Sequence, residues 1–299
     1  MDTSDLNVAL VGDSVLDDHY WLDHPANDVR AQTERTLKIA YPDRSIRVDN
    51  FAVDESTISC VLRGRAPAAH YRNGRRKAKM EPYPVEEDGV VRPLKLLREA
   101  KPTHVVLSIG GNDARIRFLQ SRNPDVVTEL MITDGFVANL RRAVETIRAE
   151  ITPNIILVYV YMPEFKTFPL LSMLPPARIL QRLLVNFSKF FIELAVEFHL
   201  PIIDLSRTFD PNNKRHYGST PIEPSNVSGQ FIADLVAQVL ARFRFGEEAG
   251  GKIFSGAGDE LVVHDLAPDA TARFSYEREL QAFFDRKAAD KPATSCVIG

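Results

Sequence analysis

Short apolar runs alternate with longer amphipathic stretches along the first 245 residues of this 299-residue chain. The apolar runs cover residues 7–11, 45–51, 103–109, 154–162 and 200–205. Helix-like apolar spacing recurs in the stretches 28–41, 56–62, 135–151, 178–199 and 228–243. Apolar strands that alternate with helices predict a parallel sheet covered on both faces. The expected fold class is α/β, a three-layer α/β/α sandwich with a five-stranded parallel sheet.

Two segments fall outside this alternation. Residues 63–93 are rich in Arg, Lys and Pro and form an insertion. Residues 246–299 begin with a Gly-rich link, and continue with a short candidate strand and a helix over 273–287. We therefore expect one domain over residues 1–245, followed by a partly flexible C-terminal extension.

The composition is that of an ordinary soluble protein, with 44% hydrophobic and 26% charged residues. A net charge of −3 gives no overall attraction to nucleic acid or to an anionic membrane. The two cysteines, Cys60 and Cys296, are far apart and favour a reducing compartment. The first residues indicate a strand rather than a signal peptide, and the longest apolar run is too short to span a bilayer. We expect a cytoplasmic protein.

Ligands of such folds bind at the carboxyl ends of the strands, which directs attention to the loops that follow them. After the first strand come Gly12, Asp13 and Ser14. A glycine permits a sharp turn there, and the serine hydroxyl would lie at the sheet edge next to a helix N-terminus. The alternative is that Ser14 only caps the following helix.

The loop after the third long apolar run carries Gly110, Gly111, Asn112 and Asp113. Two glycines allow a ligand to approach the backbone closely. The Asn112 amide is the kind of neutral donor that stabilises an oxyanion. Taken alone, this loop would serve equally well as a strand-to-helix turn.

Together, the two loops resemble the SGNH (GDSL-type) hydrolases, which are esterases and lipases on a flavodoxin-like sheet. The resemblance extends from about residue 6 to residue 245. It implies that Ser14 is the nucleophile and that the Ser14 N–H and the Asn112 amide hold the oxyanion. A second family block, N-x-A-x-x-G-x-T, is matched by Asn50, Ala52 and Thr57.

The chain departs from this family at two places. Glu55 occupies the glycine position of the second block, where it keeps a backbone donor only if it avoids positive φ, and where its carboxylate could repel the oxyanion. Before the last helix the family has an Asp and a His, whereas this chain has Thr220 and Glu223, followed by Pro224 and Ser225.

Three interpretations of this departure remain open. In the first, Glu223 is the general base, directly or through a water, which requires hydrogen-bond reach to Ser14 and a pKa near the working pH. In the second, His216 of the same loop is the base, oriented by Glu223 or Asp210. In the third, hydrolysis is lost and the pocket binds a small acylated or glycan ligand.

Three further segments suggest partners. Seven basic residues between Arg63 and Lys79 could meet an anionic partner such as a lipid headgroup, although a solvated loop is the simpler interpretation. Residues 165–179 could form an acyl-binding lip or simply lead into the next helix. The last four residues, Cys296 to Gly299, have the form of a prenylation motif, which would anchor the chain only weakly.

The sequence thus predicts a serine hydrolase that acts on small carboxylic esters. The predicted catalytic residues are Ser14, Asn112 and Glu223, with His216 as the alternative base. Asp13, Glu55, Gly111 and Asp113 flank them and are expected to contact the substrate. No metal, organic cofactor or nucleic acid is implied.

Overall fold

The computed structural model describes residues 5–66, 86–121, 123–164, 177–256, 260–266 and 271–289. Within them, seven strands form one sheet: β1 (Leu6–Gly12), β2 (Ile46–Asn50), β3 (His104–Ser108), β4 (Ile155–Tyr159), β5 (Pro201–Asp204), β6 (Gly251–Ser255) and β7 (Val262–Leu266). The helices are α1 (Val29–Ala40), α2 (Ile58–Arg63), α4 (Pro93–Ala100), α5 (Gly111–Ser121), α6 (Pro124–Thr133), α7 (Phe136–Glu150), α8 (Ala177–Phe198), α9 (Asn226–Arg242) and α10 (Thr271–Ala289).

The strands lie in the order β2-β1-β3-β4-β5-β6-β7. Strands β1 to β6 are parallel, and β7 pairs antiparallel with β6. The first five follow the flavodoxin-like order, and the chain reverses direction across the sheet between β1 and β3. The α/β prediction is confirmed, but the sheet has two strands more than the five expected, because residues 251–266 of the C-terminal extension continue it.

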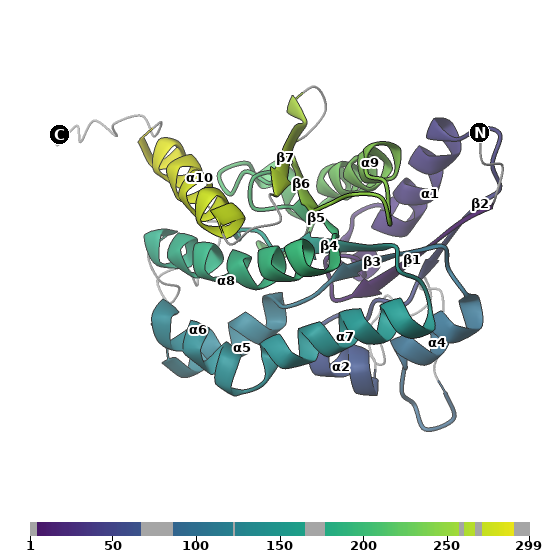
Figure 1. The fold of residues 1–299 in the computed structure, drawn as a ribbon, viewed down its shortest axis with the longest axis horizontal. Coiled ribbons are helices and arrows are strands. Elements are labelled where there is room, and N and C mark those ends of the chain that lie inside the picture. The colour runs from purple at the N-terminus through teal and green to yellow at the C-terminus, as the bar shows by residue number, and fades with distance from the viewer. Residues whose placement is uncertain are drawn as a thin grey trace.

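The sheet is covered on both faces, as Figure 1 shows. One core lies between the sheet and helices α1 and α9, and contains Val8, Leu10, Val29 and Ile232. The other core lies on the opposite face, beneath α2, α5, α7 and α8. Both faces of strands β1, β3 and β4 are therefore apolar, which explains their continuous runs of Val, Ile and Leu.

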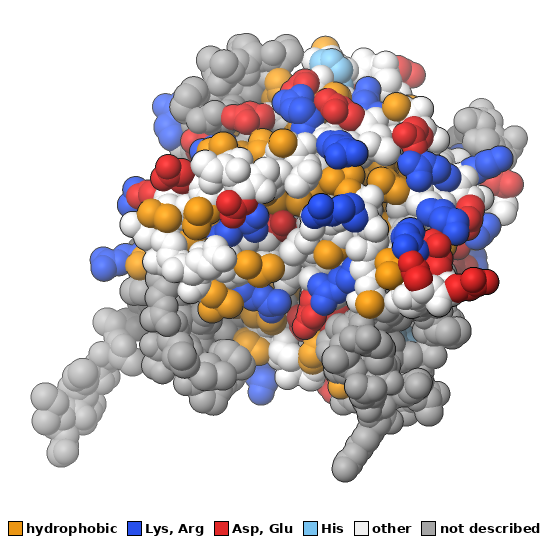
Figure 2. All heavy atoms as spheres, turned by 90° about the horizontal axis from the view of Figure 1, so that it is seen from below, with side chains coloured by type: hydrophobic (Ala, Val, Ile, Leu, Met, Phe, Trp, Pro, Cys, Tyr) orange, Lys and Arg blue, Asp and Glu red, His pale blue; other side chains and the backbone are white. Residues whose placement is uncertain are grey.

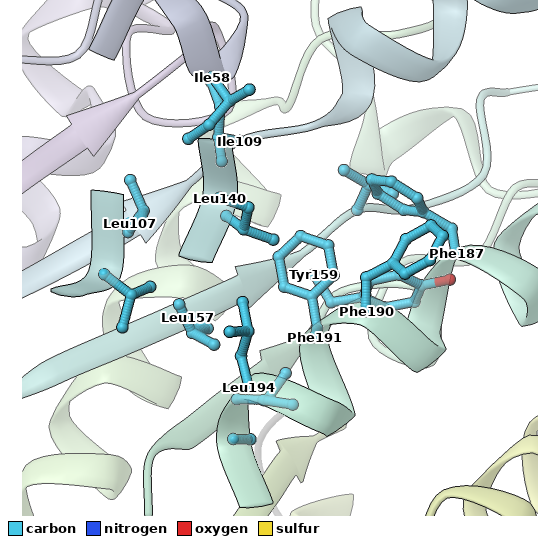
Figure 3. Packing of buried hydrophobic residues seen from close by; sticks show 14 of the residues in the cluster. Ile58, Leu107, Ile109, Leu140, Leu157, Tyr159, Phe187, Phe190, Phe191 and Leu194 are labelled. Atoms are coloured by element: carbon cyan, nitrogen blue, oxygen red, sulfur yellow. The ribbon is translucent and has the colours of Figure 1, made fainter. Parts of the chain in front are cut away.

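An aromatic cluster gives the second core its shape next to the carboxyl end of the sheet. Figure 3 shows Tyr159 of β4 beside Phe187, Phe190 and Phe191 of α8. The ring centroids of Tyr159 and Phe191 lie 5.6 Å apart, and those of Phe136 and Phe187 lie 5.4 Å apart. A side chain at Gly110 (φ 113°) would collide with Phe187, so this turn requires glycine.

The C-terminal helix α10 is tied to the sheet by a buried polar contact. Tyr276 of α10 donates a hydrogen bond to the carboxylate of Asp204, at the end of β5. Both side chains are almost completely buried. Ser206 donates to the other carboxylate oxygen of Asp204, from its backbone N–H at 2.8 Å and from its hydroxyl at 2.6 Å. Residues that the sequence analysis assigned to an extension thus take part in the core.

Candidate active site

Gly12 ends β1 with a sharp turn that brings Ser14 to the carboxyl edge of the sheet. Its φ is 144°, and a Cβ atom at this position would overlap the carbonyl oxygen of Ser108 on β3. The next residue, Asp13, donates its N–H to the same carbonyl at 3.1 Å, and its carboxylate accepts the N–H of Val15 at 3.2 Å. These bonds fix the turn, so that the half-buried Ser14 lines a cavity at this edge.

Glu223 reaches Ser14 from the loop that precedes α9. The loop is closed by a bridge between Tyr217 and Pro224 and by a 2.8 Å hydrogen bond from the Gly218 N–H to the Glu223 carbonyl. Ser225 then caps α9 by accepting the N–H groups of Val227 and Ser228. Held in this way, Glu223 is 5% exposed and lines the same cavity as Ser14.

Burial raises the pKa of Glu223 well above its ordinary value. The negative charges of Asp54 and, to a smaller extent, Asp13 raise this pKa further, whereas the Ser14 hydrogen bond and the Arg115 cation lower it. One oxygen of the carboxyl group, Oε2, has no hydrogen-bond partner among the described residues. Glu223 therefore has a pKa well above that of an exposed glutamate, together with one carboxyl oxygen that has no partner among the described residues.

Asn112 lies at the start of α5 and is 8% exposed. One N–H of its amide donates to the Ser56 carbonyl at 3.0 Å, which fixes the orientation of the side chain. Among the described residues, the backbone N–H groups of Ser14 and Glu55 find no acceptor. Ser14, Glu55 and Asn112 all line the same cavity, where these groups are available to a ligand oxygen.

Glu55 has a φ of 61°, so the prediction that a positive φ would cost the backbone donor is wrong: in this conformation the Glu55 N–H has no acceptor among the described residues and Glu55 still lines the cavity. The turn is set by its neighbours, because the Asp54 N–H donates to the Asp17 carboxylate at 2.7 Å and the Ser56 N–H donates to the Val53 carbonyl at 3.1 Å. Glu55 thus adopts a left-handed conformation that suits glycine. Its half-exposed carboxylate forms an ion pair with Arg65 at 2.5 Å.

Of the other residues predicted to contact the substrate, two line the cavity and one does not. Asp13 and Gly111 line the cavity together with Ser14. Asp113 lies outside the lining residues, and its carboxylate accepts the Ile58 N–H at the start of α2 at 3.0 Å. Burial raises the pKa of Asp13 to about 7 and that of Asp113 to about 6. These two carboxyl groups hold the strand-end turns in place.

His216 is not brought to Ser14. Its Nδ1 accepts the Asp210 N–H at 2.9 Å, and its Nε2 lies 3.1 Å from the Asn213 amide nitrogen. The ring also meets Phe231 of α9 edge-on, at 5.3 Å between centroids. Burial lowers the pKa of the imidazole. His216 is not among the residues that line the Ser14 cavity.

The cavity has a volume of about 350 Å³ and includes residues that sequence reasoning did not identify. Trp21, the chain's one tryptophan, lines it and donates its indole N–H to Asp54 at 3.2 Å. The family-like block that begins at Asn50 was a sequence signal for Asp54, which lies within it, one residue before Glu55. Arg115 also lines the cavity, and no motif pointed to it.

Several other predictions concern residues outside this site. Three of the predicted features lie wholly or partly outside the described residues: residues 165–176 of the predicted lip, five of the seven basic residues between Arg63 and Lys79, and Cys296.

On the face shown in Figure 2, the described basic and acidic side chains are interspersed. No helix in the described part of the chain is both long and apolar enough to cross a membrane. Within the same part, no three His, Cys, Asp or Glu side chains are grouped as a metal site.

Comparison with known proteins identifies the fold. No protein-family model and no curated protein sequence matches the chain. Among solved structures, the lipase Lip_vut3 from a goat rumen metagenome is similar with a TM-score of 0.53 and 13% identity, over 81% of this chain and 99% of the lipase. The psychrotrophic esterase EstA from Pseudoalteromonas has a TM-score of 0.49 and 16% identity, over 80% of this chain and 98% of the esterase.

The chain therefore has the SGNH/GDSL hydrolase fold, as the sequence motifs predicted. At 13% identity, the likeness to Lip_vut3 defines the fold and leaves the chemistry to be argued from the site.

Proposed function

We propose that this protein hydrolyses carboxylic esters, with Ser14 as the nucleophile and Glu223 as the general base. The observation that carries the proposal is that Ser14 and the buried carboxyl group of Glu223 line one cavity, where the Ser14 side chain acts on the pKa of Glu223. A serine hydroxyl is a weak nucleophile on its own and needs a base within hydrogen-bond reach. The raised pKa of Glu223 makes it a stronger base than an exposed glutamate.

The reaction proceeds in two stages. Ser14 Oγ attacks the ester carbonyl carbon while its proton passes to Glu223, and the resulting oxyanion accepts hydrogen bonds from the N–H groups of Ser14 and Glu55 and from Asn112. Collapse of this intermediate breaks the bond to the alcohol oxygen, which receives the proton from Glu223. A water, deprotonated by Glu223, then attacks the acyl-serine and releases the carboxylic acid and Ser14.

The second candidate function is binding of an acylated ligand without hydrolysis. It is favoured by the negative charges of Asp54 and Asp13, which raise the pKa of Glu223 beyond the effect of burial. If Glu223 keeps its proton at the working pH, it cannot accept one from Ser14. The carboxyl group would then donate a hydrogen bond to the ligand instead.

Covalent labelling separates the two functions. A fluorophosphonate probe should modify Ser14, as located by mass spectrometry, and short-chain p-nitrophenyl esters should be cleaved faster by the wild type than by Ser14→Ala. Glu223→Gln should reduce both labelling and turnover, whereas His216→Ala should change neither by more than about twofold, since its ring lies outside the cavity. An unlabelled Ser14, with turnover equal to that of Ser14→Ala, would leave only the binding function.

A further inference from the structure

The wall of the cavity on one side of Ser14 is apolar. It is formed by side chains from α5, from the residues that follow β4, and from the first turns of α8. These residues are Ala114, Phe118, Val160, Met162, Leu180, Leu183 and Leu184. Arg115, next to Ala114 on α5, is a charged residue that also lines the cavity, but these seven side chains together form an uncharged surface suited to a hydrocarbon group.

Two helix faces form this wall. Leu180, Leu183 and Leu184 are spaced by three and four residues along α8 and therefore share one face, and Ala114 and Phe118 do the same on α5. The hydroxyl of Tyr159 donates a hydrogen bond to the Leu184 carbonyl, and the aromatic cluster of Figure 3 packs directly behind this turn of α8. The wall is therefore preformed rather than assembled around a ligand.

The opposite side of the cavity carries the base. Glu223 precedes α9, and Trp21 lies beside the same loop, because the Ser219 N–H donates to the Trp21 carbonyl at 3.2 Å. Helices α1 and α9 cover one face of the sheet, and α5 and α8 cover the other (Figure 1). Ser14 thus lies between a polar side, with Glu223, Asp54 and Trp21, and the apolar wall.

This arrangement fixes the direction of a bound ester. The base that takes the Ser14 proton must return it to the leaving alcohol oxygen, so the alcohol lies on the Glu223 side. The acyl chain extends from the other side of the carbonyl carbon, toward α5 and α8. A cavity of about 350 Å³ is at the lower end of the range for ligand sites, which fits a medium-length chain together with the ester group.

We propose that the apolar wall between α5 and α8 binds the acyl chain of the substrate, and that the substrates are esters of medium-length, unbranched fatty acids such as hexanoate and octanoate. The proposal rests on the proposed ester hydrolysis at Ser14. It assigns specificity to Leu183, Ala114 and their neighbours, and it places the alcohol beside Trp21 and Thr220.

A chain-length series of p-nitrophenyl esters tests the proposal. The value of kcat/KM should rise from acetate to octanoate by at least about 30-fold, because each buried methylene contributes up to about fourfold in rate, and should fall again for palmitate. Leu183→Trp should fill the cavity and lower the octanoate-to-acetate ratio at least tenfold. Leu119→Trp is the matched control on α5, since Leu119 is 71% exposed and lies outside the lining residues.

A second variant covers the case in which Leu183→Trp does not fold. Ala114→Met narrows the cavity from α5, and should also lower the octanoate-to-acetate ratio. Acetate cleaved faster than octanoate by the wild type, or a ratio that neither cavity variant changes, would overturn the proposal.

Binding to the Ser14→Ala variant separates this proposal from the proposed function. Titration calorimetry should show that octanoate binds more tightly than acetate to Ser14→Ala, and that Leu183→Trp in the same background weakens octanoate binding. If the protein cleaves no ester but shows this preference, the acyl site stands and the hydrolysis fails. If esters are cleaved without a preference for octanoate in rate or binding, the hydrolysis stands and the acyl site fails.

Discussion

Ser14 and Glu223, a residue 209 positions later in the chain, line the same cavity at the carboxyl edge of a parallel sheet, where the Ser14 side chain lowers the pKa of the Glu223 carboxyl group. Glu223 occupies the place where hydrolases of this fold are expected to carry a histidine. A carboxylate base is effective only while it is ionised, so the state of Glu223 links the electrostatics of the cavity to activity.

The first prediction concerns the pH dependence of ester cleavage. In the proposed mechanism Glu223 is the base in its ionised form, and its pKa is raised, so kcat/KM should fall as the pH drops through a value well above the pKa of an ordinary glutamate. After burial, the charge of Asp54 raises the pKa of Glu223 most. Asp54→Asn removes this charge and should move the acidic limb of the pH–rate profile, where kcat/KM falls, to lower pH. Arg115→Gln removes the cation and should move it to higher pH.

The pH–rate profiles of the wild type and the two variants provide the measurement. Asp13 and Ser14 also act on Glu223, and both are unchanged in these variants, so the two shifts report on Asp54 and Arg115. Shifts in the same direction, or no shift in either profile, would show that another group controls the limb.

The closeness of Ser14, Asn112 and Glu223 in one cavity could be predicted from the sequence, because strand ends of a parallel sheet meet at one edge. Ser14 and Asn112 follow β1 and β3, which are neighbours, and Glu223 was identified from the Pro and Ser that follow it. The place of His216 could not be predicted, since it depends on the turn that offers the Asp210 N–H to its ring. The ion pair between Arg65 and Glu55 depends on folding of the insertion and was equally hidden.

Some strands and helices were missed for different reasons. Helix α6 has a recognisable start, with Asn123 as its cap and Pro124 in its first turn, but it lies between a predicted strand and a predicted helix and was not assigned as an element of its own. Strand β6 lies within the Gly-rich link and was missed for that reason, whereas the candidate strand expected after the link corresponds to β7. The apolar wall of the cavity combines residues of α5 and α8, which lie about 65 positions apart, and no local spacing indicates such a pairing.

The second prediction concerns the oxyanion donor. Asn112→Ala removes an amide whose orientation is fixed by its 3.0 Å hydrogen bond to the Ser56 carbonyl. We expect kcat to fall by about 10²–10³-fold with a smaller change in KM, because the donor acts on charge that develops in the transition state. Steady-state kinetics check this, and circular dichroism confirms the fold. A rise in KM of similar size, with kcat unchanged, would assign Asn112 to substrate binding instead.

The third prediction concerns backbone strain at Glu55. Its φ of 61° suits glycine, whereas a β-branched residue is strongly disfavoured there. Glu55→Val should therefore lower the free energy of unfolding by about 1–3 kcal/mol relative to Glu55→Gly. Both variants lose the same ion pair with Arg65, so the difference between them isolates the backbone. Urea denaturation measures it, and equal stabilities would mean that the turn relaxes.

The fourth prediction is a pH-dependent stability that involves Asp13. Burial raises the pKa of Asp13 from 3.8 to about 7, with the charges of Asp113 and Asp54 adding to the effect. The folded state then binds a proton more tightly than the unfolded state. The resulting stabilisation is complete below about pH 4 and is lost as the pH rises to about 7.

Asp13→Asn keeps an oxygen for the Val15 N–H but cannot ionise. The free energy of unfolding of Asp13→Asn minus that of the wild type should rise by up to about 4 kcal/mol from pH 4 to pH 8. Denaturant titrations across this range provide the measurement. The control is Asp125→Asn, whose more than half-exposed ion pair with Arg182 should give almost no such gain. A constant difference between Asp13→Asn and the wild type would show that Asp13 has the same pKa in both states.

The fifth prediction tests whether the C-terminal helix α10 stabilises the sheet. Tyr276→Phe removes the donor to one oxygen of the buried Asp204 carboxylate, and leaves that oxygen without this partner inside the core. We expect a loss of about 1–3 kcal/mol in the free energy of unfolding. Tyr41→Phe is the matched control, because the buried hydroxyl of Tyr41 has no hydrogen-bond partner among the described residues, and its removal should be neutral or stabilising. If both variants unfold at the same denaturant concentration as the wild type, α10 contributes nothing to stability through Asp204. If only Tyr276→Phe is destabilised and its transition remains a single one, α10 and the sheet unfold together.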